Sequence, residues 1–499
     1  MTVFVMPSFL LRLEAVNFSE SCYDTCDIST IRGGSMMLSN AHELARVVLP
    51  QEIQHEPTSF GASHAIWQFE AADANAAEKV RNDTLHALAK HKQLRHATFV
   101  CAVVANDDGS ADALHRLRMH NHWRQYQEPT VVPPDLPDAK RQGKRICELD
   151  HVRPATMEIR KGNDSYWVST STYDRRVYGR KQKRMFYKEL CGSDLAVVHD
   201  LSDLTSHLES SQHRLHGKMA LIYIDGNQQS EMAADLSLDR LSKFRQYVRE
   251  QHRRFLTTLL EEIVQLMPAQ GSSNEWFHWD SEQNELQVRL ETLLWGGDDI
   301  VLVVPAWKGW YVARKFYEAA QGWEFGGQKF THATGLIYCS HKAPIQDMRR
   351  YAEDLVVQCK KTKNSEGNYQ DLMGYEVLES IDVISSDLDR WRSARLGESE
   401  KSGAEAIASA LLLSPAQMDG IESMIRSIRV GVDDPDSILS RRQIERRARR
   451  MQHSMIGDEQ FDSDVTNYFA GSEFEKIGLG PHSLRAKLFH LTAMWDYLT

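Results

Sequence analysis

The feature that most constrains the fold is a buried strand that ends in an aspartate and is followed, further along the chain, by an acidic hairpin. The strand Ala220–Ile224 runs into Asp225, and the hairpin carries Gly296-Gly297-Asp298-Asp299 between two apolar strands. A bare carboxylate at the end of a buried strand is costly, so it must be solvated or hold a cation. Two glycines permit a tight turn and a close approach of a ligand to the backbone. The sequence therefore predicts a sheet with a cation site at one edge.

The elements around this feature follow the order β-α-β-β-α-β, with a further helix at the end. Their expected ranges are Met219–Ile224, Leu236–Met267, Glu285–Leu294, Ile300–Val304, Trp307–Ala320, His332–Tyr338 and Ile345–Lys361. This order predicts a ferredoxin-like sheet covered by helices on one face, the architecture of polymerase palms and nucleotide cyclases.

The N-terminal part of the chain shows a similar alternation. Strand patterns at Ser8–Phe18, Ser63–Phe69 and Ala97–Val104 enclose helix patterns at Ser29–Val48 and Ala74–Lys92. A chain of 499 residues is too long for one core. We therefore expect an α+β protein with two ferredoxin-like palms and a C-terminal helical bundle. The expected domains are a first, non-catalytic palm at 1–111, a basic insertion at 112–192, a second, catalytic palm at 193–363 and a helical domain at 364–499.

Composition and charge narrow the class of protein. The seven cysteines are scattered and odd in number, which fits a reducing compartment better than a disulfide framework. No apolar run reaches the length of a membrane span, so we expect a cytoplasmic protein without a membrane partner. The net charge of −10 argues against a general polyanion binder.

The charge is nevertheless uneven along the chain. Between Lys140 and Lys188 there are 14 Lys or Arg against 5 Asp or Glu, interleaved with aromatic residues. This stretch is either a solvated face or a contact with phosphates. For the second basic run, Arg441–Arg450, we expect a solvated face.

Two aspartates carry the expected chemistry. In a β-α-β-β sheet the first strand lies beside the hairpin, so Asp225 and Asp298 are expected to converge on a pair of Mg²⁺ or Mn²⁺ ions, with Asp299 beside them. Such ions suit phosphoryl transfer, in which a hydroxyl attacks a nucleoside triphosphate and pyrophosphate leaves. The alternative is a hairpin whose Gly296-Gly297 pair only turns the chain and whose aspartates face water.

Lys360 and the scattered cysteines and histidines are further candidates for binding a phosphate or a metal. Lys360 lies at the end of the last predicted helix, where it either compensates the helix dipole or reaches a triphosphate as a point charge. Cys147, His151 and Cys191 supply at most a partial zinc set, so no zinc is expected. His199-Asp200 is isolated, so no HD-type nuclease is expected.

The segments Ala220–Asn227, Leu293–Trp310, Ala333–Ile337 and Glu353–Lys360 resemble the second palm of the CRISPR polymerase family. That family includes the large subunit of type III CRISPR effector complexes and stand-alone relatives in antiphage defence, and the GGDEF diguanylate cyclases are more distant relatives. The N-terminal segment resembles its first palm, with Tyr23-Asp24-Thr25, Asp27–Ser35 and Gly61–Ser63 at its loops and strand starts. The C-terminal stretch Leu491–Leu498 is similar in position to the end of its helical domain.

The resemblance implies two palms packed face to face around two nucleoside triphosphates, ATP being favoured. A cyclic nucleotide or cyclic oligoadenylate would be released as a signal for a downstream effector in phage defence. Asp225 and Asp298 would be metal ligands, Ile224 would lend a backbone carbonyl, and Lys360 would contact the triphosphate. Gly226, Asn227, Gly296 and Gly297 would approach the nucleotide.

The first palm is expected to seat the acceptor nucleotide, since joining two nucleotides requires the attacking hydroxyl within roughly 3–3.5 Å of the α-phosphate. The candidate seat is the loop Asp27–Ser35, where Gly33-Gly34 would allow close approach, Arg32 would pair with a phosphate, and Ser35 would contact the nucleotide. The alternative for this palm is core packing alone.

Two other functions stay open. The basic stretch allows an RNA-binding scaffold subunit of a CRISPR-type complex, although the net charge disfavours RNA as a partner. In place of the glycine that often follows Asp225-Gly226-Asn227 in the family, this chain has Gln228-Gln229-Ser230. That departure allows a degenerate cyclase that senses a nucleotide without turning it over.

Overall fold

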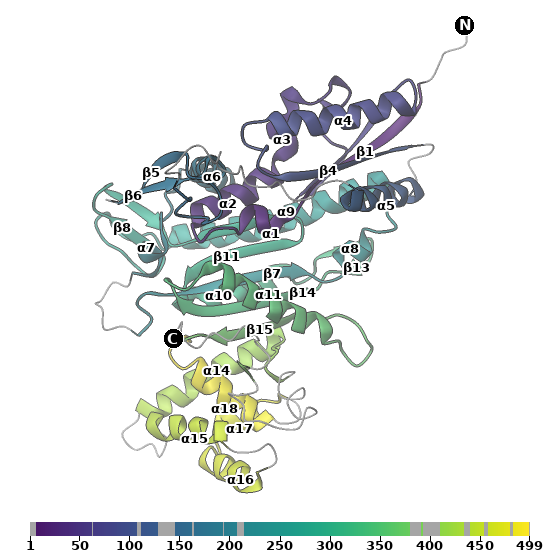
Figure 1. Cartoon of the computed structure of the whole chain (residues 1–499). Coiled ribbons are helices and arrows are strands. Elements are labelled where there is room, and N and C mark those ends of the chain that lie inside the picture. Colours follow the sequence, from purple (N-terminus) through teal and green to yellow (C-terminus); the bar gives the residue numbers. More distant parts are fainter. Residues whose placement is uncertain are drawn as a thin grey trace.

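Two sheets that share the order of four strands form the centre of the protein (Figure 1). The computed structural model describes residues 6–61, 63–106, 111–127, 145–161, 164–192, 194–206, 214–379, 391–392, 410–433, 440–453, 458–479 and 483–498.

The first sheet is antiparallel, in the order β2-β3-β1-β4. Its strands are β1 (Ser8–Val16), β2 (Ser59–Phe60), β3 (His64–Glu70) and β4 (Thr98–Ala105). Alternate residues of β1 face opposite sides. Phe9, Leu11 and Leu13 pack with α4 (Ala74–Lys90), whereas Leu10 faces the core shared with α5 (Ala111–Gln127).

The second sheet has the order β10-β11-β7-β14-β15. Its strands are β7 (Lys218–Gly226), β10 (Glu291–Gly296), β11 (Asp299–Pro305), β14 (His332–Ser340) and β15 (Leu372–Val377). The first four pair antiparallel, and β15 joins β14 in parallel. Numbered within each sheet, the first has the order 2-3-1-4 and the second the order 2-3-1-4-5, so both contain the ferredoxin-like arrangement and the second adds β15 at its edge. The predicted pair of ferredoxin-like domains is confirmed.

Helices cover both faces of the second sheet, not one face as predicted. Ile222, Ile224 and their neighbours on one face pack under α9 (Leu238–Gln265) and α10 (Gly309–Ala320). Leu221 and Tyr223 face the other side, where α11 (Ile345–Lys361) and α2 (Ile28–Ser39) lie. Because strand side chains alternate, a central strand that is apolar at every position must be covered twice.

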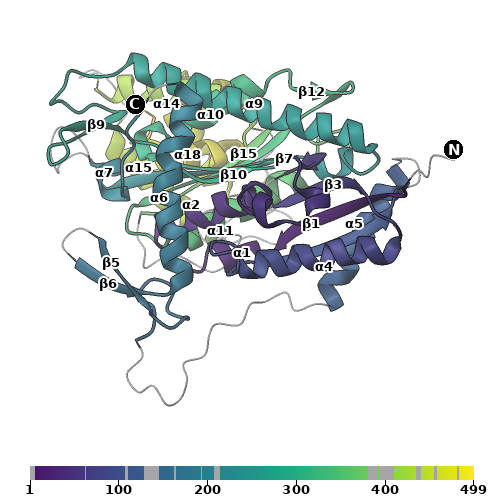
Figure 2. The ribbon, with the colours of Figure 1, turned by 90° about the horizontal axis from the view of Figure 1, so that it is seen from above.

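The predicted insertion at 112–192 divides between two roles. Its first helix, α5, packs on β4 and β1 and so belongs with the first sheet. The hairpin β5–β6 (Met157–Lys161, Asp164–Val168) and the long helix α6 (Thr170–Cys191) follow (Figure 2). Ser169 caps the start of α6 by accepting from the Thr172 N–H, and Gly192 ends it with φ 67°.

The C-terminal helices pack against the last strand of the second sheet. They are α14 (Pro415–Asp433), α15 (Arg441–His453), α16 (Glu459–Tyr468), α17 (Glu473–Lys476) and α18 (Ser483–Ala493). The Tyr375 hydroxyl of β15 lies 2.7 Å from Nδ1 of His490 on α18. This strand lies beyond residue 363, in the segment that the sequence assigned to the helical domain. In the part of the chain that the structure describes, no helix is long and apolar enough to cross a membrane.

Candidate functional site

The carboxylates of Asp225 and Asp299 come together on one face of the second sheet. Asp225 lies near the end of β7 and is directly opposite Asp299, the first residue of β11. Directly opposed residues of an antiparallel pair project to the same side, and here that side also carries Tyr223. The register therefore creates a pair of acidic side chains at the edge where the sequence predicted a cation site.

Both carboxyl groups resist ionisation. Burial raises the pKa of Asp225, and the nearby Asp298 raises it further, while the Lys360 ammonium opposes both effects. Burial likewise raises the pKa of Asp299 well above its usual range, with added repulsion from Asp225 and Asp298. Like charges opposed on a sheet are destabilising. The protein alone thus leaves this group of carboxylates short of positive charge.

Lys360 supplies one positive charge on this side. It comes from the last turn of α11, and its Nζ lies 2.5 Å from Oδ2 of Asp225. The same Nζ donates to the Gly226 carbonyl at 3.3 Å. Its position beside the carboxylates favours the second sequence interpretation, in which it does more than compensate the helix dipole.

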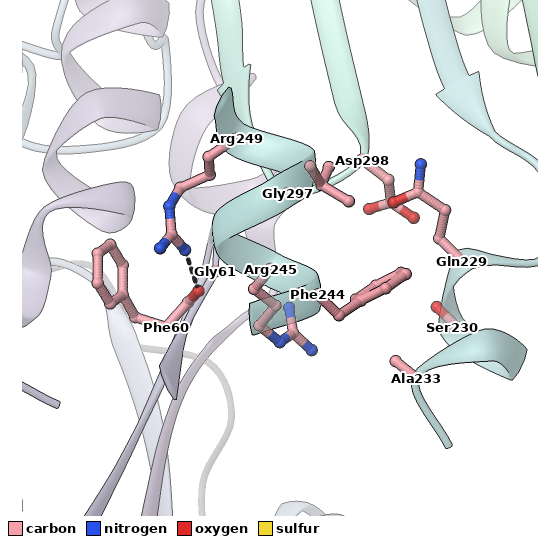
Figure 3. A pocket seen from close by; sticks show the side chains of 11 residues that line it. Phe60, Gly61, Gln229, Ser230, Ala233, Phe244, Arg245, Arg249, Gly297 and Asp298 are labelled. Atoms are coloured by element: carbon pink, nitrogen blue, oxygen red, sulfur yellow. Dashed lines mark hydrogen bonds between the residues drawn. The ribbon is translucent and has the colours of Figure 1, made fainter. Parts of the chain in front are cut away.

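The Gly-Gly turn separates the two neighbouring aspartates. Gly296 pairs with Asp299, so Gly297 and Asp298 form the turn, and Gly297 adopts φ 65°. Asp298 lines a pocket on the α9 side (Figure 3). The structure therefore pairs Asp225 with Asp299, whereas the sequence predicted the pair Asp225 and Asp298. The reason is the register, which places the residue after the turn opposite Asp225.

Hydrogen bonds from Asn227 hold the loop that follows Asp225 in place. Asn227 is buried, its N–H donates to the Thr331 carbonyl at 2.8 Å, and its Nδ2 donates to Thr331 Oγ1 at 2.9 Å. Gln228 takes φ 57°, and the amide of Gln229 lies over the Gly226 backbone, where a Cβ would be 2.1 Å from Nε2. Asn227 thus anchors the loop, and Gln229 lines the pocket. Ile224 lies between Ile300 and Thr334 in the sheet.

The pocket beside Asp298 is built from both halves of the protein. It has a volume of about 50 Å³, and its walls are Phe60 and Gly61 from the first sheet, Phe244 and Arg245 from α9, and Gln229. Figure 3 shows the arginines of α9 on the side of Phe60, and Asp298 near Gln229.

A larger cavity of about 320 Å³ adjoins this pocket and shares Phe60, Gly61, Arg249 and Gly297 with it. Gly296 and Trp295 of the hairpin line it, as do Ser39 and Asn40 at the end of α2. The space between the two halves therefore opens onto the Gly-Gly turn.

Arg32 and Ser35 do not contribute to this pocket. Arg32 is only 2% exposed, donates through Nε to the Gly179 carbonyl at 3.1 Å, and forms an ion pair with Glu291. Lys183 lies 2.6 Å from the other oxygen of Glu291. Ser35 is also buried. The expected acceptor seat is therefore wrong for these side chains, since they face the helix–sheet core.

The packing of the glycines next to Arg32 explains why the prediction of an acceptor seat at this loop was wrong. A Cβ on Gly33 would lie 1.8 Å from the Arg175 carbonyl oxygen, and one on Gly179 would lie 2.8 Å from the Gly33 Cα. These glycines let α2 and α6 pack backbone to backbone, and close approach to a ligand is not their purpose.

Much of the basic stretch is used inside the protein. Arg175 pairs with Asp24 at 2.8 Å, Arg176 with Asp27 at 2.5 Å, and Lys183 with Glu291. These three side chains are buried. Arg175 and Arg176 join α6 to the N-terminal segment, and Lys183 joins it to β10, which counts against a phosphate-binding face for this part of the stretch. Lys140 to Lys144 lie outside the described residues.

Tyr23 brings the N-terminal half to the carboxylate side as well. Its ring stacks with the Arg349 guanidinium of α11 at 4.3 Å, and its buried hydroxyl has no hydrogen-bond partner in the described structure. Burial is the main cause that raises its pKa, and the nearby charge of Asp299 adds to the effect. Sequence reasoning noticed this tyrosine only as part of a loop.

Arg245 and Arg249 were missed altogether. They lie within a long amphipathic helix, where charged residues are usually solvated, and their neighbours come from strands far away in the sequence. The one sequence signal that could have identified them is their spacing of four residues, which places both on the same face of α9.

No protein-family model matches the sequence, and no curated protein is similar to it in sequence. Solved structures do match. The chain is similar to the Csm1-Csm4 cassette in complex with AMPPNP, with TM-score 0.55 and 12% identity over 99% of this chain and 70% of the other. It is similar to the same cassette in complex with cA4, with TM-score 0.51, 11% identity and the same coverage. A third match is the Csm1-Csm4 subcomplex of the type III-A CRISPR-Csm interference complex, with TM-score 0.51, 11% identity, and 99% and 70% coverage. The chain therefore has the fold of Csm1 from type III CRISPR complexes, which supports the resemblance to the CRISPR polymerase family.

Proposed function

We propose that this protein is a nucleotidyltransferase that joins nucleoside triphosphates, ATP being favoured, into a cyclic nucleotide or oligonucleotide. The observation that carries the proposal is the pairing of Asp225 with Asp299 beside Lys360, at the mouth of a Gly-Gly turn. These groups suit a triphosphate, whose phosphates need both positive charge and carboxylate-bound cations.

The residues present fit divalent cations. Asp225 and Asp299 are opposed and have raised pKa values, so a cation between them would relieve their repulsion. In the described parts of the chain, no three His, Cys, Asp or Glu side chains are placed to hold a metal ion by themselves. The remaining ligands would be water, substrate phosphates and the Ile224 carbonyl, a mixture that Mg²⁺ favours. When bound, Mg²⁺ or Mn²⁺ neutralises triphosphate charge and assists loss of the hydroxyl proton.

The chain's own groups would position the reactants. Lys360 would orient the triphosphate as a point charge, and Gly226, Gly296 and Gly297 would let its phosphates approach the backbone. The pocket walls from the first sheet would hold the second nucleotide facing the first, which brings the attacking hydroxyl into reach. Arg32 and Ser35 have no part in this.

The matched structures support the choice of substrate and product, since they hold AMPPNP and cA4. By analogy with them, this chain would act beside a Csm4-like partner in antiviral defence, and an effector would sense its product. The test is incubation with each nucleoside triphosphate and Mg²⁺ or Mn²⁺, followed by mass spectrometry and a pyrophosphate assay. Asp225→Asn and Asp299→Asn should abolish the product, whereas Asp239→Asn, an exposed aspartate of α9, should not.

One observation favours a second candidate, a nucleotide sensor without turnover. Gln229 fills the space over Gly226 in which a phosphate would meet the backbone. Tight ATP binding with no pyrophosphate release would select this candidate. Restored turnover in Gln229→Gly would identify the side chain as the block.

A further inference from the structure

Three arginines and a histidine surround Arg245 where α9 meets the first sheet. Arg12 comes from β1, His64 from β3, Arg118 from α5 and Arg249 from α9. They are close enough for Arg12, Arg118 and Arg249 each to lower the pKa of Arg245. Burial is the larger cause, and together they lower that pKa to about 10.

Most of these neighbours already have partners. Arg12 pairs with Glu14 at 3.0 Å. Arg118 donates to the Ala233 and Ala234 carbonyls at 2.8 and 2.7 Å. Arg249 donates to the Phe60 carbonyl at 2.6 Å, and its guanidinium lies 3.9 Å from the Phe60 ring centre.

Arg245 is different, because it makes no hydrogen bond to the described part of the protein, and its buried Nε has no partner. The buried Nε2 of His64 also lacks a partner, and so does Nε2 of Gln229, which lines the pocket together with Arg245. Buried polar atoms without partners are rare in folded proteins, and ordered water, an ion or a bound ligand completes their hydrogen bonds.

Gly61 makes room for the Arg245 guanidinium. A Cβ at this position would lie 2.6 Å from Arg245 Nη1 and 2.7 Å from His64 Cε1. A side chain here would push the two groups apart, so glycine keeps the guanidinium beside the imidazole.

Negative charge in this region is scarce. Asp298 attracts Arg245 from the Gly-Gly turn, Asp235 acts on Arg118, and Glu14 is used by Arg12. Three acidic groups thus face four arginines, and His64 is kept neutral because burial and the arginines lower its pKa well below the usual range. An anion would meet an unused guanidinium fork and a neutral imidazole donor.

We propose that Arg245, with Arg249 and His64, forms an anion site that holds the phosphate chain of a second nucleotide, the one that supplies the attacking hydroxyl. The anion site stands on the unpartnered donors, and its assignment to the acceptor nucleotide rests on the proposed function. The site lies on the Asp298 side of the turn, whereas Lys360 lies with Asp225 on the α11 side. Because Lys360 and Arg245 lie on different sides of the turn, the proposal assigns them to two different phosphate chains.

The first experiment measures binding of inorganic tripolyphosphate by calorimetry in EDTA, where the carboxylates repel the probe. The wild-type protein should bind it, and Arg245→Gln should weaken binding about tenfold or more, as expected for losing charge-assisted hydrogen bonds. Arg254→Gln is the matched control, because Arg254 is exposed on the same helix and pairs with Glu250. If Arg245→Gln binds tripolyphosphate as tightly as the wild type, the anion site is wrong. The same holds if Arg254→Gln weakens binding as much as Arg245→Gln does. Arg245→Lys, which keeps the charge and loses the fork, replaces it if the glutamine variant does not fold.

The second experiment separates a nucleotide from RNA. A single-stranded RNA without 5′ phosphates should fail to displace tripolyphosphate, and displacement would overturn the nucleotide assignment. In the joining reaction, ATP should be a better acceptor than adenosine, and Arg245→Gln should remove this preference. If no triphosphate is joined at all, the proposed function fails, while the binding comparison still decides the anion site.

Discussion

Asp299, the first residue of β11, lies directly opposite Asp225 of β7, and the Lys360 ammonium lies 2.5 Å from the Asp225 carboxylate. The protein keeps two like charges facing each other on a buried edge with one lysine to offset them. Such an arrangement is unfavourable for stability alone. It fits a site that is completed by cations.

The pH dependence of stability should expose this repulsion. The folded-state pKa values of both aspartates are raised, so their contribution to stability is fully present below the usual value of 3.8 and is lost as pH rises through the folded pKa. Asp299→Asn should therefore melt above the wild type at neutral pH, with a difference that shrinks toward pH 4. Thermal melts over a pH series measure this, and a difference that does not change with pH would contradict it.

Divalent cations should act on the same pair. Mg²⁺ should raise the melting temperature of the wild-type protein at neutral pH, because it binds the folded state and relieves the repulsion. In Asp299→Asn the Mg²⁺ effect should be much smaller. An equal shift in both proteins would place the cation elsewhere.

Lys360 should matter for the substrate more than for the fold. Lys360→Met should reduce product formation at least tenfold and raise the KM for the triphosphate, since the point charge is lost. Lys361, the exposed next residue, provides the control, and Lys361→Met should keep its turnover. Steady-state kinetics of the two variants, measured under the same conditions, test this prediction. Equal losses of turnover in both variants would show that Lys360 does not contact the substrate.

Arg32 should behave as a structural residue. Arg32→Ala leaves the buried Glu291 with Lys183 as its one remaining charged partner, and breaking a buried ion pair costs about 3–5 kcal/mol. Denaturant unfolding should show this loss, while Arg184→Ala, which breaks an exposed pair with Asp194, should unfold almost like the wild type. A stable Arg32→Ala protein with impaired turnover would return Arg32 to the active site.

The sequence predicts both ferredoxin-like sheets because their strands and helices have clear periodicities. It also predicts the edge at which Asp225 and the Gly-Gly turn meet. It could not choose between Asp298 and Asp299, because that choice depends on a register that shifts by one residue with the length of the turn. The glycines beside Arg32 were misleading for a related reason, since close approach to a helix and close approach to a phosphate need the same missing Cβ.

The pocket residues from the first sheet and α9 were beyond sequence reasoning. Arg245 is far along the chain from Gly61 and His64, and only the packing of α9 against the first sheet brings it beside them. The strand β15 was missed because the boundary of the second palm was expected after residue 363, although the residues that follow connect α11 to that strand.

The most direct test of the account is the release of pyrophosphate from ATP by the wild-type protein and by Asp299→Asn, with mass spectrometry of the products. The account predicts that the wild type releases pyrophosphate in step with the formation of phosphodiester-linked nucleotides. It predicts that Asp299→Asn, although folded, releases essentially none. Equal release by the two proteins, or no release by the wild type with any nucleoside triphosphate and either Mg²⁺ or Mn²⁺, would contradict it.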